Sequence, residues 1–122
     1  MPEIRPTAVT NCNFALGTSW KTQTGYELLF TMDGSLELLG PTHKRLWETG
    51  TRGRGAGIVS MQWDGDLVIY DAARRRALWS AGTKGHAGAV LAIQDDGNVV
   101  IYDKMRAPIW STGTSRAQLT RS

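Results

Sequence analysis

The chain has 122 residues, of which 41% are hydrophobic, and carries a formal net charge of +3. This length and composition fit one globular domain with a modest core. They exclude a membrane-spanning chain, because no apolar run approaches the roughly 18 residues that a span needs. The densest basic run, Arg74–Arg76, is typical of a solvated turn, so a nucleic-acid partner is not expected.

The first segment, MPEIRPTAVTNCNF, lacks the continuous hydrophobic stretch of a secretory signal. Cys12 is the only cysteine, so an intrachain disulfide is impossible and the fold must depend on packing. The sequence therefore indicates a cytoplasmic protein, or a part of a larger or non-classically exported one.

The rest of the chain is a threefold repeat. An Asp-Gly pair recurs at intervals of 31 and 32 residues, and a tryptophan that precedes Gly-Thr recurs at intervals of 32 and 31. These landmarks are Asp33, Asp64 and Asp96, and Trp47, Trp79 and Trp110. The copies span about 25–51, 56–83 and 88–114, with glycine-rich linkers between them that are typical of turns. We expect one domain over residues 1–115, followed by a polar tail at 116–122.

Within each copy the hydrophobic period is two, which predicts strands. Asp-Gly between alternating apolar segments predicts a hairpin, and the segment that ends at the tryptophan predicts a third strand. The residues expected to face inward are Leu28, Phe30, Leu36 and Leu38, then Val59, Met61, Leu67 and Ile69, then Leu91, Ile93, Val99 and Ile101. No copy can bury such a face alone, but three packed about a common axis can. We expect the recurring tryptophans to fill the centre.

The third copy, QDDGNVVIY, places polar groups on the opposite face of its hairpin. These outward residues are Gln94, Asp96, Asn98, Val100 and Tyr102. Amide, carboxylate and phenol groups around one apolar residue have the chemistry of a shallow sugar site. The spacing alone leaves two interpretations open, a sugar site and an ordinary solvated strand face.

This nine-residue segment matches in full the QxDxNxVxY pattern of the bulb-type, snowdrop-agglutinin-like mannose-binding lectins, which the tandem repeats and the IWSTGT ending also resemble. The resemblance covers about residues 16–114. It implies an all-β fold, the β-prism II, with three antiparallel sheets in pseudo-threefold symmetry. It also implies calcium-independent binding of mannose and mannose-rich glycans. By the same resemblance Asp96 and Asn98 contact the axial O2, Gln94 and Tyr102 bond O3 and O4, and Val100 packs on the ring.

The other two copies depart from the pattern. The second retains most of the motif, in Gln62, Asp64, Asp66, Val68 and Tyr70. Asp66 stands in place of asparagine and, when ionised, can only accept hydrogen bonds, while its charge adds to that of Asp64. A weaker, more pH-sensitive second site is therefore expected. The first copy keeps only Asp33 and places Glu37 where an apolar contact is needed, so we expect a degenerate, purely structural site.

Two further features leave alternatives open. Trp63, in the second Asp-Gly turn, is expected to be a partly buried turn residue; the alternative is a stacking contact with a sugar. The tail at 116–122 fits a linker or a strand exchanged with a partner. Strand exchange at the C-terminus is familiar in the resembled family, so a homodimer is expected.

Other functional classes fit less well. His43 and His86 lie in separate turns without a repeated acidic partner, so no catalytic residues and no enzyme activity are expected. The Asp-rich turns lack the ligand spacing of a calcium loop, so neither a metal nor a cofactor is predicted. The main alternative function is a degenerate lectin fold that serves as a protein-interaction module without binding sugar.

Overall fold

The structure, a computed structural model, describes residues 7–115, and the C-terminal tail discussed above lies outside them. Twelve strands in this range form three four-stranded antiparallel sheets. The first sheet has the order β3 (Ser19–Lys21), β4 (Glu27–Phe30), β5 (Leu36–Leu39), β6 (Arg45–Glu48). The second has the order β2 (Cys12–Ala15), β7 (Ala56–Met61), β8 (Leu67–Asp71), β9 (Ala77–Ser80). The third has the order β1 (Thr7–Val9), β10 (Val90–Ile93), β11 (Val99–Tyr102), β12 (Pro108–Ser111).

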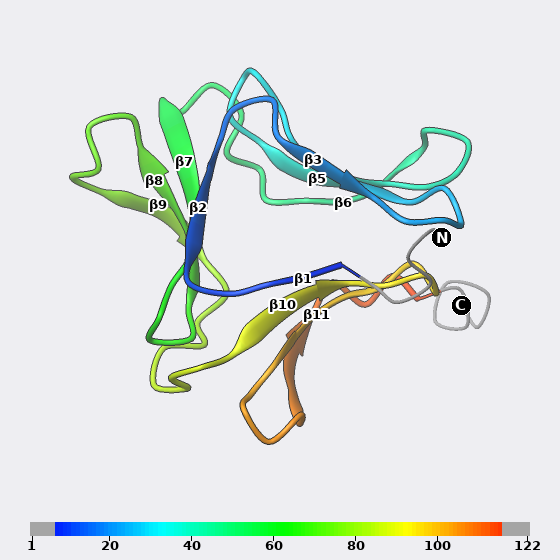
Figure 1. The fold of residues 1–122 in the computed structure, drawn as a ribbon. Coiled ribbons are helices and arrows are strands. Elements are labelled where there is room, and N and C mark those ends of the chain that lie inside the picture. The colour runs from blue at the N-terminus through cyan, green and yellow to red at the C-terminus, as the bar shows by residue number, and fades with distance from the viewer. Residues whose placement is uncertain (1–6, 116–122) are drawn as a thin grey trace.

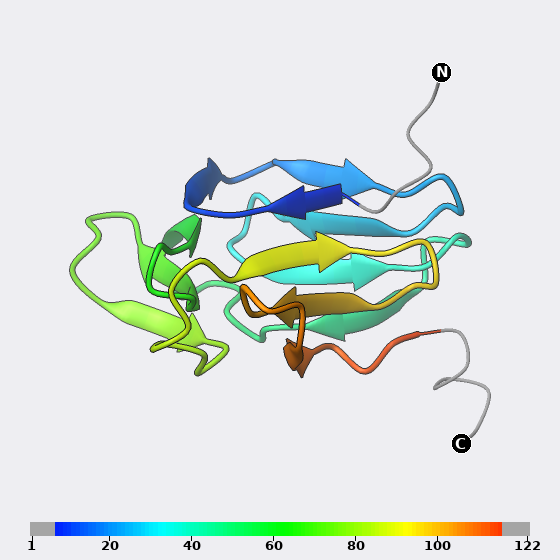
Figure 2. The same cartoon turned by 60° about the horizontal axis from the view of Figure 1, so that its bottom comes forward.

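The three sheets surround a common axis like the sides of a prism (Figure 1). This is the β-prism II predicted from the sequence, with one repeat in each sheet. Each repeat supplies three strands, and the fourth comes from the N-terminal segment, which crosses from one sheet to the next. Figure 2 shows the result at the third sheet, where β1 lies beside β10, with Thr7 opposite Ile93.

The twelve side chains predicted to face inward form the core, and each is at most 2% exposed. Alternation along β4, β5 and their counterparts places these residues on one face of every sheet. At the centre, Trp47, Trp79 and Trp110 contact one another edge to face, with ring centroids 5.6–5.9 Å apart. The prediction that the recurring tryptophans fill the centre is therefore confirmed.

The recurring Asp-Gly pair forms a three-residue hairpin loop in every repeat. In the third, the N–H of Gly97 donates to the carbonyl of Gln94 at 3.1 Å, and Gly97 has φ 91°. A turn followed by a glycine with positive φ is a common way to close such a loop. The geometry aims the side chains on either side of the loop at the outer face of the sheet.

The threonine of the Gly-Thr pair that follows each tryptophan has a structural role. The Thr114 hydroxyl donates to the carbonyl of Gly97 at 2.7 Å, which ties the end of the last strand to the Asp-Gly loop. Thr51 and Thr83 make the same bond to Gly34 and Gly65, at 2.6 and 2.7 Å. These threonines are at most 4% exposed, so the loop that carries the aspartate is fixed from behind.

Candidate functional site

The outer face of the third sheet brings together all five residues predicted for the best site. Gln94 directly follows β10 and Tyr102 is the last residue of β11, and the Gln94 amide donates a hydrogen bond to the Tyr102 phenol. Asp96 lies in the loop between the strands, where its Oδ1 accepts the backbone N–H of Asn98 at 3.0 Å. The side chains are therefore held in place by contacts to one another before any ligand arrives.

Asn98 is fixed by the strand behind it. Its Oδ1 accepts the N–H of Thr114 at 3.2 Å and the hydroxyl of Thr112 at 3.1 Å. Since one atom receives two donors, that atom is the amide oxygen, and the Nδ2 group must point elsewhere. Asn98 is thus orientated so that its free groups are two N–H donors.

The polar atoms of this cluster that have no partner within the described residues include both hydrogen-bond donors and acceptors. Within residues 7–115, no hydrogen bond engages Gln94 Oε1, Asp96 Oδ2, the Tyr102 hydroxyl proton or the Asn98 Nδ2 protons. Two acceptors and two donors on one face can bracket neighbouring hydroxyl groups, each of which donates one bond and accepts others. Val100, which the alternation of β11 places on the same face, is only 4% exposed.

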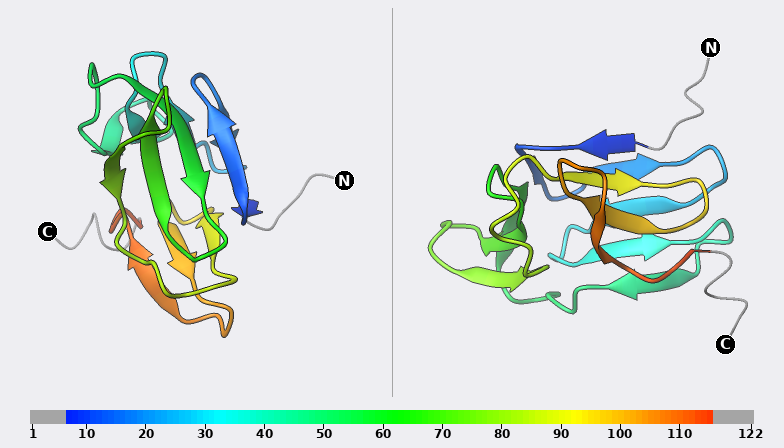
Figure 3. Two further views of the ribbon diagram at one scale, coloured as in Figure 1. Left: turned by 90° about the vertical axis from the view of Figure 1, so that its left-hand side faces the viewer. Right: turned by 90° about the horizontal axis from the view of Figure 1, so that it is seen from below.

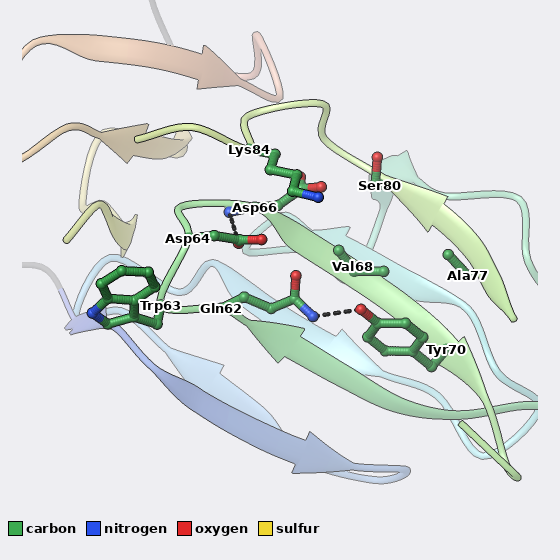
Figure 4. A pocket seen from close by; sticks show the side chains of 9 residues that line it. All are labelled: Gln62, Trp63, Asp64, Asp66, Val68, Tyr70, Ala77, Ser80 and Lys84. Atoms are coloured by element: carbon green, nitrogen blue, oxygen red, sulfur yellow. Dashed lines mark hydrogen bonds between the residues drawn. The ribbon is translucent and has the colours of Figure 1, made fainter. Parts of the chain in front are cut away.

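The second sheet repeats the arrangement around a depression of about 490 Å³ (Figure 4). That volume lies within the range of small-molecule sites. Gln62 donates to the Tyr70 phenol, Asp64 Oδ1 accepts the N–H of Asp66 at 3.0 Å, and Val68 is 4% exposed. All five residues predicted for the second site line this depression.

The Oδ1 atom of Asp66 has the same role as the Oδ1 atom of Asn98, but its second oxygen stands where Asn98 has its amide nitrogen. Asp66 Oδ1 accepts the N–H of Thr83 at 3.1 Å and lies 3.4 Å from the oxygen of the Thr83 hydroxyl. The free atom is then Oδ2, an acceptor, where Asn98 presents a donor. The predicted difference between the two sites is therefore located at one atom.

Three residues at this depression were missed or misjudged from the sequence. Trp63 is 68% exposed and lines the depression, so the expectation of a partly buried turn residue is wrong. Lys84 and Ser80 also line it, and both are labelled in Figure 4. Lys84 follows Gly-Thr, where the first repeat has Arg52, and this recurring basic position was the available signal.

The first sheet carries an ion-pair cluster where the other two carry the motif. Arg52 lies 3.2 Å from Asp33 Oδ2 and donates to Glu37 Oε2 at 2.9 Å, and Arg45 lies 3.6 Å from the same Glu37 oxygen. Glu37 occupies the position of Val100 and is 6% exposed. The hydrogen bond to Glu37, followed by the charge of Asp33, raises the pKa of Arg52 above its usual value. Arg52 thus pairs with Asp33 Oδ2. The equivalent oxygens of Asp64 and Asp96 have no such partner within residues 7–115.

The described residues hold no cluster of three or more His, Cys, Asp or Glu side chains that could bind a metal ion. No helix in residues 7–115 is long and apolar enough to cross a membrane.

No protein-family model and no curated protein matches the sequence, whereas solved structures do. A monomeric monocot mannose-binding lectin from Gastrodia elata matches with a TM-score of 0.79 and 32% identity, over 91% of this chain and 98% of that one. A lectin from Marasmius oreades matches with a TM-score of 0.78 and 30% identity, over 93% of each chain. The mannose-specific agglutinin of snowdrop, Galanthus nivalis, complexed with methyl-α-D-mannoside, matches with a TM-score of 0.71 and 28% identity, over 90% of this chain and 96% of that one.

The fold and its relatives define this chain as a lectin, a protein built to bind carbohydrate. It belongs to the bulb-type mannose-binding lectin family.

Proposed function

We propose that the protein binds mannose and mannose-rich glycans, without calcium, at the outer faces of its third and second sheets. The observation that carries the proposal is the paired free donors and acceptors of Gln94, Asp96, Asn98 and Tyr102, fixed by contacts within the sheet. The snowdrop relative holds methyl-α-D-mannoside, and the motif reproduces the pattern that the sequence resembles in that family. No chemical step on the sugar is proposed.

The two sites are expected to differ in affinity, with the third sheet the better one. Its free Asn98 Nδ2 group can donate to a sugar oxygen, whereas the free Asp66 Oδ2 can only accept. Lys84 returns one positive charge to the second site and thereby offsets part of the repulsion between Asp64 and Asp66. The first sheet is proposed to have no sugar site, because Arg52 already occupies Asp33.

Useful affinity requires more than one site. A neutral hydrogen bond nets about 1 kcal/mol, and the cost of association removes most of the sum of four. A single shallow site is therefore expected to bind at about the millimolar level, about −4 kcal/mol. Two sites that engage one branched glycan can gain roughly 10²- to 10⁴-fold.

The expected homodimer stays a prediction. Each of the three sheets has four strands from the same chain, with β1, β2 and β3 as the added ones. Sedimentation of the protein with and without residues 116–122 tests whether that tail assembles two chains.

Affinity chromatography tests the proposed function. The protein is passed over immobilised mannose and immobilised galactose in EDTA, with elution by methyl α-mannoside. We expect selective retention on mannose and elution by the free sugar. Absence of retention on mannose, and on a high-mannose glycoprotein, would favour the protein-interaction module instead.

A further inference from the structure

The outer face of the second sheet carries another depression beside the proposed sugar site. It has a volume of about 360 Å³ and is lined by Asn13, Ile58, Ser60, Gln62, Tyr70 and Arg74. Gln62 and Tyr70 line both depressions, and their mutual hydrogen bond forms the wall between them. The two depressions are thus neighbouring parts of one surface, the face turned to the viewer in the left panel of Figure 3.

The strand register shows how the two depressions connect. Asn13 on β2 pairs with Ser60 on β7, Ser60 pairs with Val68 on β8, and Val68 pairs with Ser80 on β9. Paired residues point to the same side of a sheet, and neighbouring strands lie about 4.8 Å apart, so this row spans roughly 14 Å. Val68 and Ser80 belong to the proposed sugar site, and Asn13 and Ser60 belong to the second depression. A row of this length accommodates more than one sugar ring.

Three of the polar side chains that line the second depression have no partner in the part of the chain that the structure describes. Within residues 7–115, no hydrogen bond or ion pair engages the side chains of Asn13, Ser60 or Arg74. The Ser60 side chain is 8% exposed and lines the depression, so its hydroxyl is available there to a ligand or to water. Asp71, the acid nearest in sequence to Arg74, uses its Oδ1 for the backbone N–H of Arg75 at 2.8 Å. Because no ion pair within residues 7–115 includes Arg74, its guanidinium remains available to an external acceptor.

The charge of the second depression is opposite to that of its neighbour. Arg74 is its only charged side chain, whereas Asp64 and Asp66 line the proposed sugar site. A guanidinium presents a planar set of donors that matches carboxylate, sulfate or phosphate groups. An amide and a hydroxyl beside it can bond sugar hydroxyls, and Ile58 offers a small apolar contact.

We propose that this second depression binds an acidic sugar unit that is linked to the neutral hexose held in the adjacent site. The inference rests on the proposed function, which it extends from a monosaccharide to an acidic oligosaccharide. The glycosidic link crosses the wall formed by Gln62 and Tyr70, and Arg74 bonds the anionic group of the second unit. Asn13 and Ser60 bond its hydroxyls.

The other two sheets lack this depression's polar row. The position of Ser60 is held by Ala92 in the third sheet and by Leu29 in the first, because each of these residues pairs with the counterpart of Val68. The third sheet thus provides an internal control, with the sugar motif intact and the Ser60 hydroxyl absent. Arg106 holds in the third sheet the turn position of Arg74, but Ala92 and Ala8 stand there in place of Ser60 and Asn13. Only the second sheet has both the basic side chain and the polar pair, so only it is expected to distinguish acidic from neutral disaccharides.

The test measures binding at each sheet separately by two-dimensional NMR, with amide signals of Gly65 and Gly97 as reporters. The probes are methyl α-mannoside, neutral mannobioses of each linkage, and the corresponding disaccharides in which the second unit carries a carboxylate or a phosphate. We expect at least one acidic disaccharide to bind the second sheet about 10-fold more tightly than methyl α-mannoside. The third sheet should show no such gain, and added salt should reduce the gain at the second.

Two variants identify the residues responsible. Arg74→Gln should remove the preference for acidic over neutral disaccharides, and Ser60→Ala, which copies Ala92, should reduce the gain for both. Neither change should alter the affinity for methyl α-mannoside, since neither residue lines the first depression. Whichever of the carboxylate and phosphate probes gains more identifies the source of the anionic group.

The negative outcomes are distinct. Equal affinity of acidic and neutral disaccharides at the second sheet would overturn the assignment of an acidic unit. Equal affinity of all disaccharides and methyl α-mannoside would overturn the second depression as a sugar site. Failure of methyl α-mannoside to bind either sheet would overturn the proposed function itself, and this inference with it.

Discussion

The outer faces of the first and third sheets share a backbone and differ in what fills them. Asp33 and Asp96 occupy equivalent loops, each tied from behind by a threonine hydroxyl, that of Thr51 or of Thr114. On the third sheet the free carboxylate oxygen of Asp96 faces solvent, whereas on the first Arg52 lies 3.2 Å from that of Asp33. An internal cation thus takes the place that we propose for a sugar hydroxyl.

The difference shows that the scaffold and the binding chemistry are separable. The inner face of each repeat must fill the common core, so its apolar residues are constrained by packing. The outer face has no such duty, and Glu37 is enough to close it when a basic residue after Gly-Thr, Arg52, pairs with it. Buried Glu37 then requires that residue, because a carboxylate at 6% exposure is costly without a partner.

The largest expected effect comes from reproducing the ion pair of the first sheet on the outer face of the second sheet. Val68→Glu together with Lys84→Arg places an acid and a guanidinium where Glu37 and Arg52 stand in the first repeat. We expect the affinity of the second sheet for methyl α-mannoside to fall roughly 30-fold or more, about 2 kcal/mol, because the pair fills the depression. NMR titration measures it, and Lys84→Arg alone is the control that should retain binding. Unchanged affinity in the double variant would contradict the comparison.

A second substitution removes the Asn98 side chain, which completes the sugar motif on the third sheet and has no counterpart amide on the other two. Asn98→Ala takes away the free N–H donors and the acceptor of Thr114, and we expect binding at the third sheet to weaken about 10-fold. The second sheet, titrated in the same sample, is the internal control and should be unchanged. If the third sheet kept its affinity, Asn98 would have no direct contact with the sugar.

A smaller effect is expected from exchanging the asparagine and aspartate between faces. Asp66→Asn keeps the acceptor that holds Thr83 and converts the free oxygen into a donor, so affinity at the second sheet should rise about 5-fold, about 1 kcal/mol. Asn98→Asp is the converse and should weaken the third sheet by a similar factor. Calorimetry checks both, and shifts of the same sign would sink the explanation.

The smallest effect concerns the stability of the closed face. Arg52→Gln leaves Glu37 with Arg45 at 3.6 Å as its remaining cation, so Tm should fall by a few degrees while sugar binding at the other sheets is unchanged. The folded-state pKa of Arg52 is raised, so its contribution is present below the unfolded-state pKa and is lost only as pH rises through the higher folded value. The difference in Tm should therefore persist from about pH 6 to about pH 10. The double variant Arg52→Gln and Glu37→Gln should recover most of the loss.

The repeat and its periodicity allowed the sheets and the core to be predicted, because alternation places residues such as Val99 and Ile101 on one face whatever surrounds them. The source of the fourth strands was not predictable in this way. Strands β1 and β3 have three residues each, too few for a period, and β1 pairs with residues far along the chain.

The sites were predicted to the extent that the hairpin fixes them. Gln94, Asp96, Asn98 and Tyr102 meet because they follow one loop, whereas Arg52 and Lys84 approach from beyond the third strand. The exposure of Trp63 was misjudged because a turn residue's burial depends on neighbours from other repeats. The polar row of the second depression was also missed, since Asn13 reaches it through a pairing between distant segments.

The short N-terminal strands also govern the order in which the molecule can be assembled. During synthesis β1 leaves the ribosome before the other strands described above, yet its partner β10 follows most of them. Contacts between distant residues slow folding, because the chain must lose the entropy of a long loop before the contact stabilises anything. The third sheet, which carries the better of the two proposed sites, can therefore be completed only after nearly the whole chain has emerged. Until then β1 has no partner strand and is exposed to pairing with another chain, and a nascent-chain chaperone that covers it should raise the yield of folded protein.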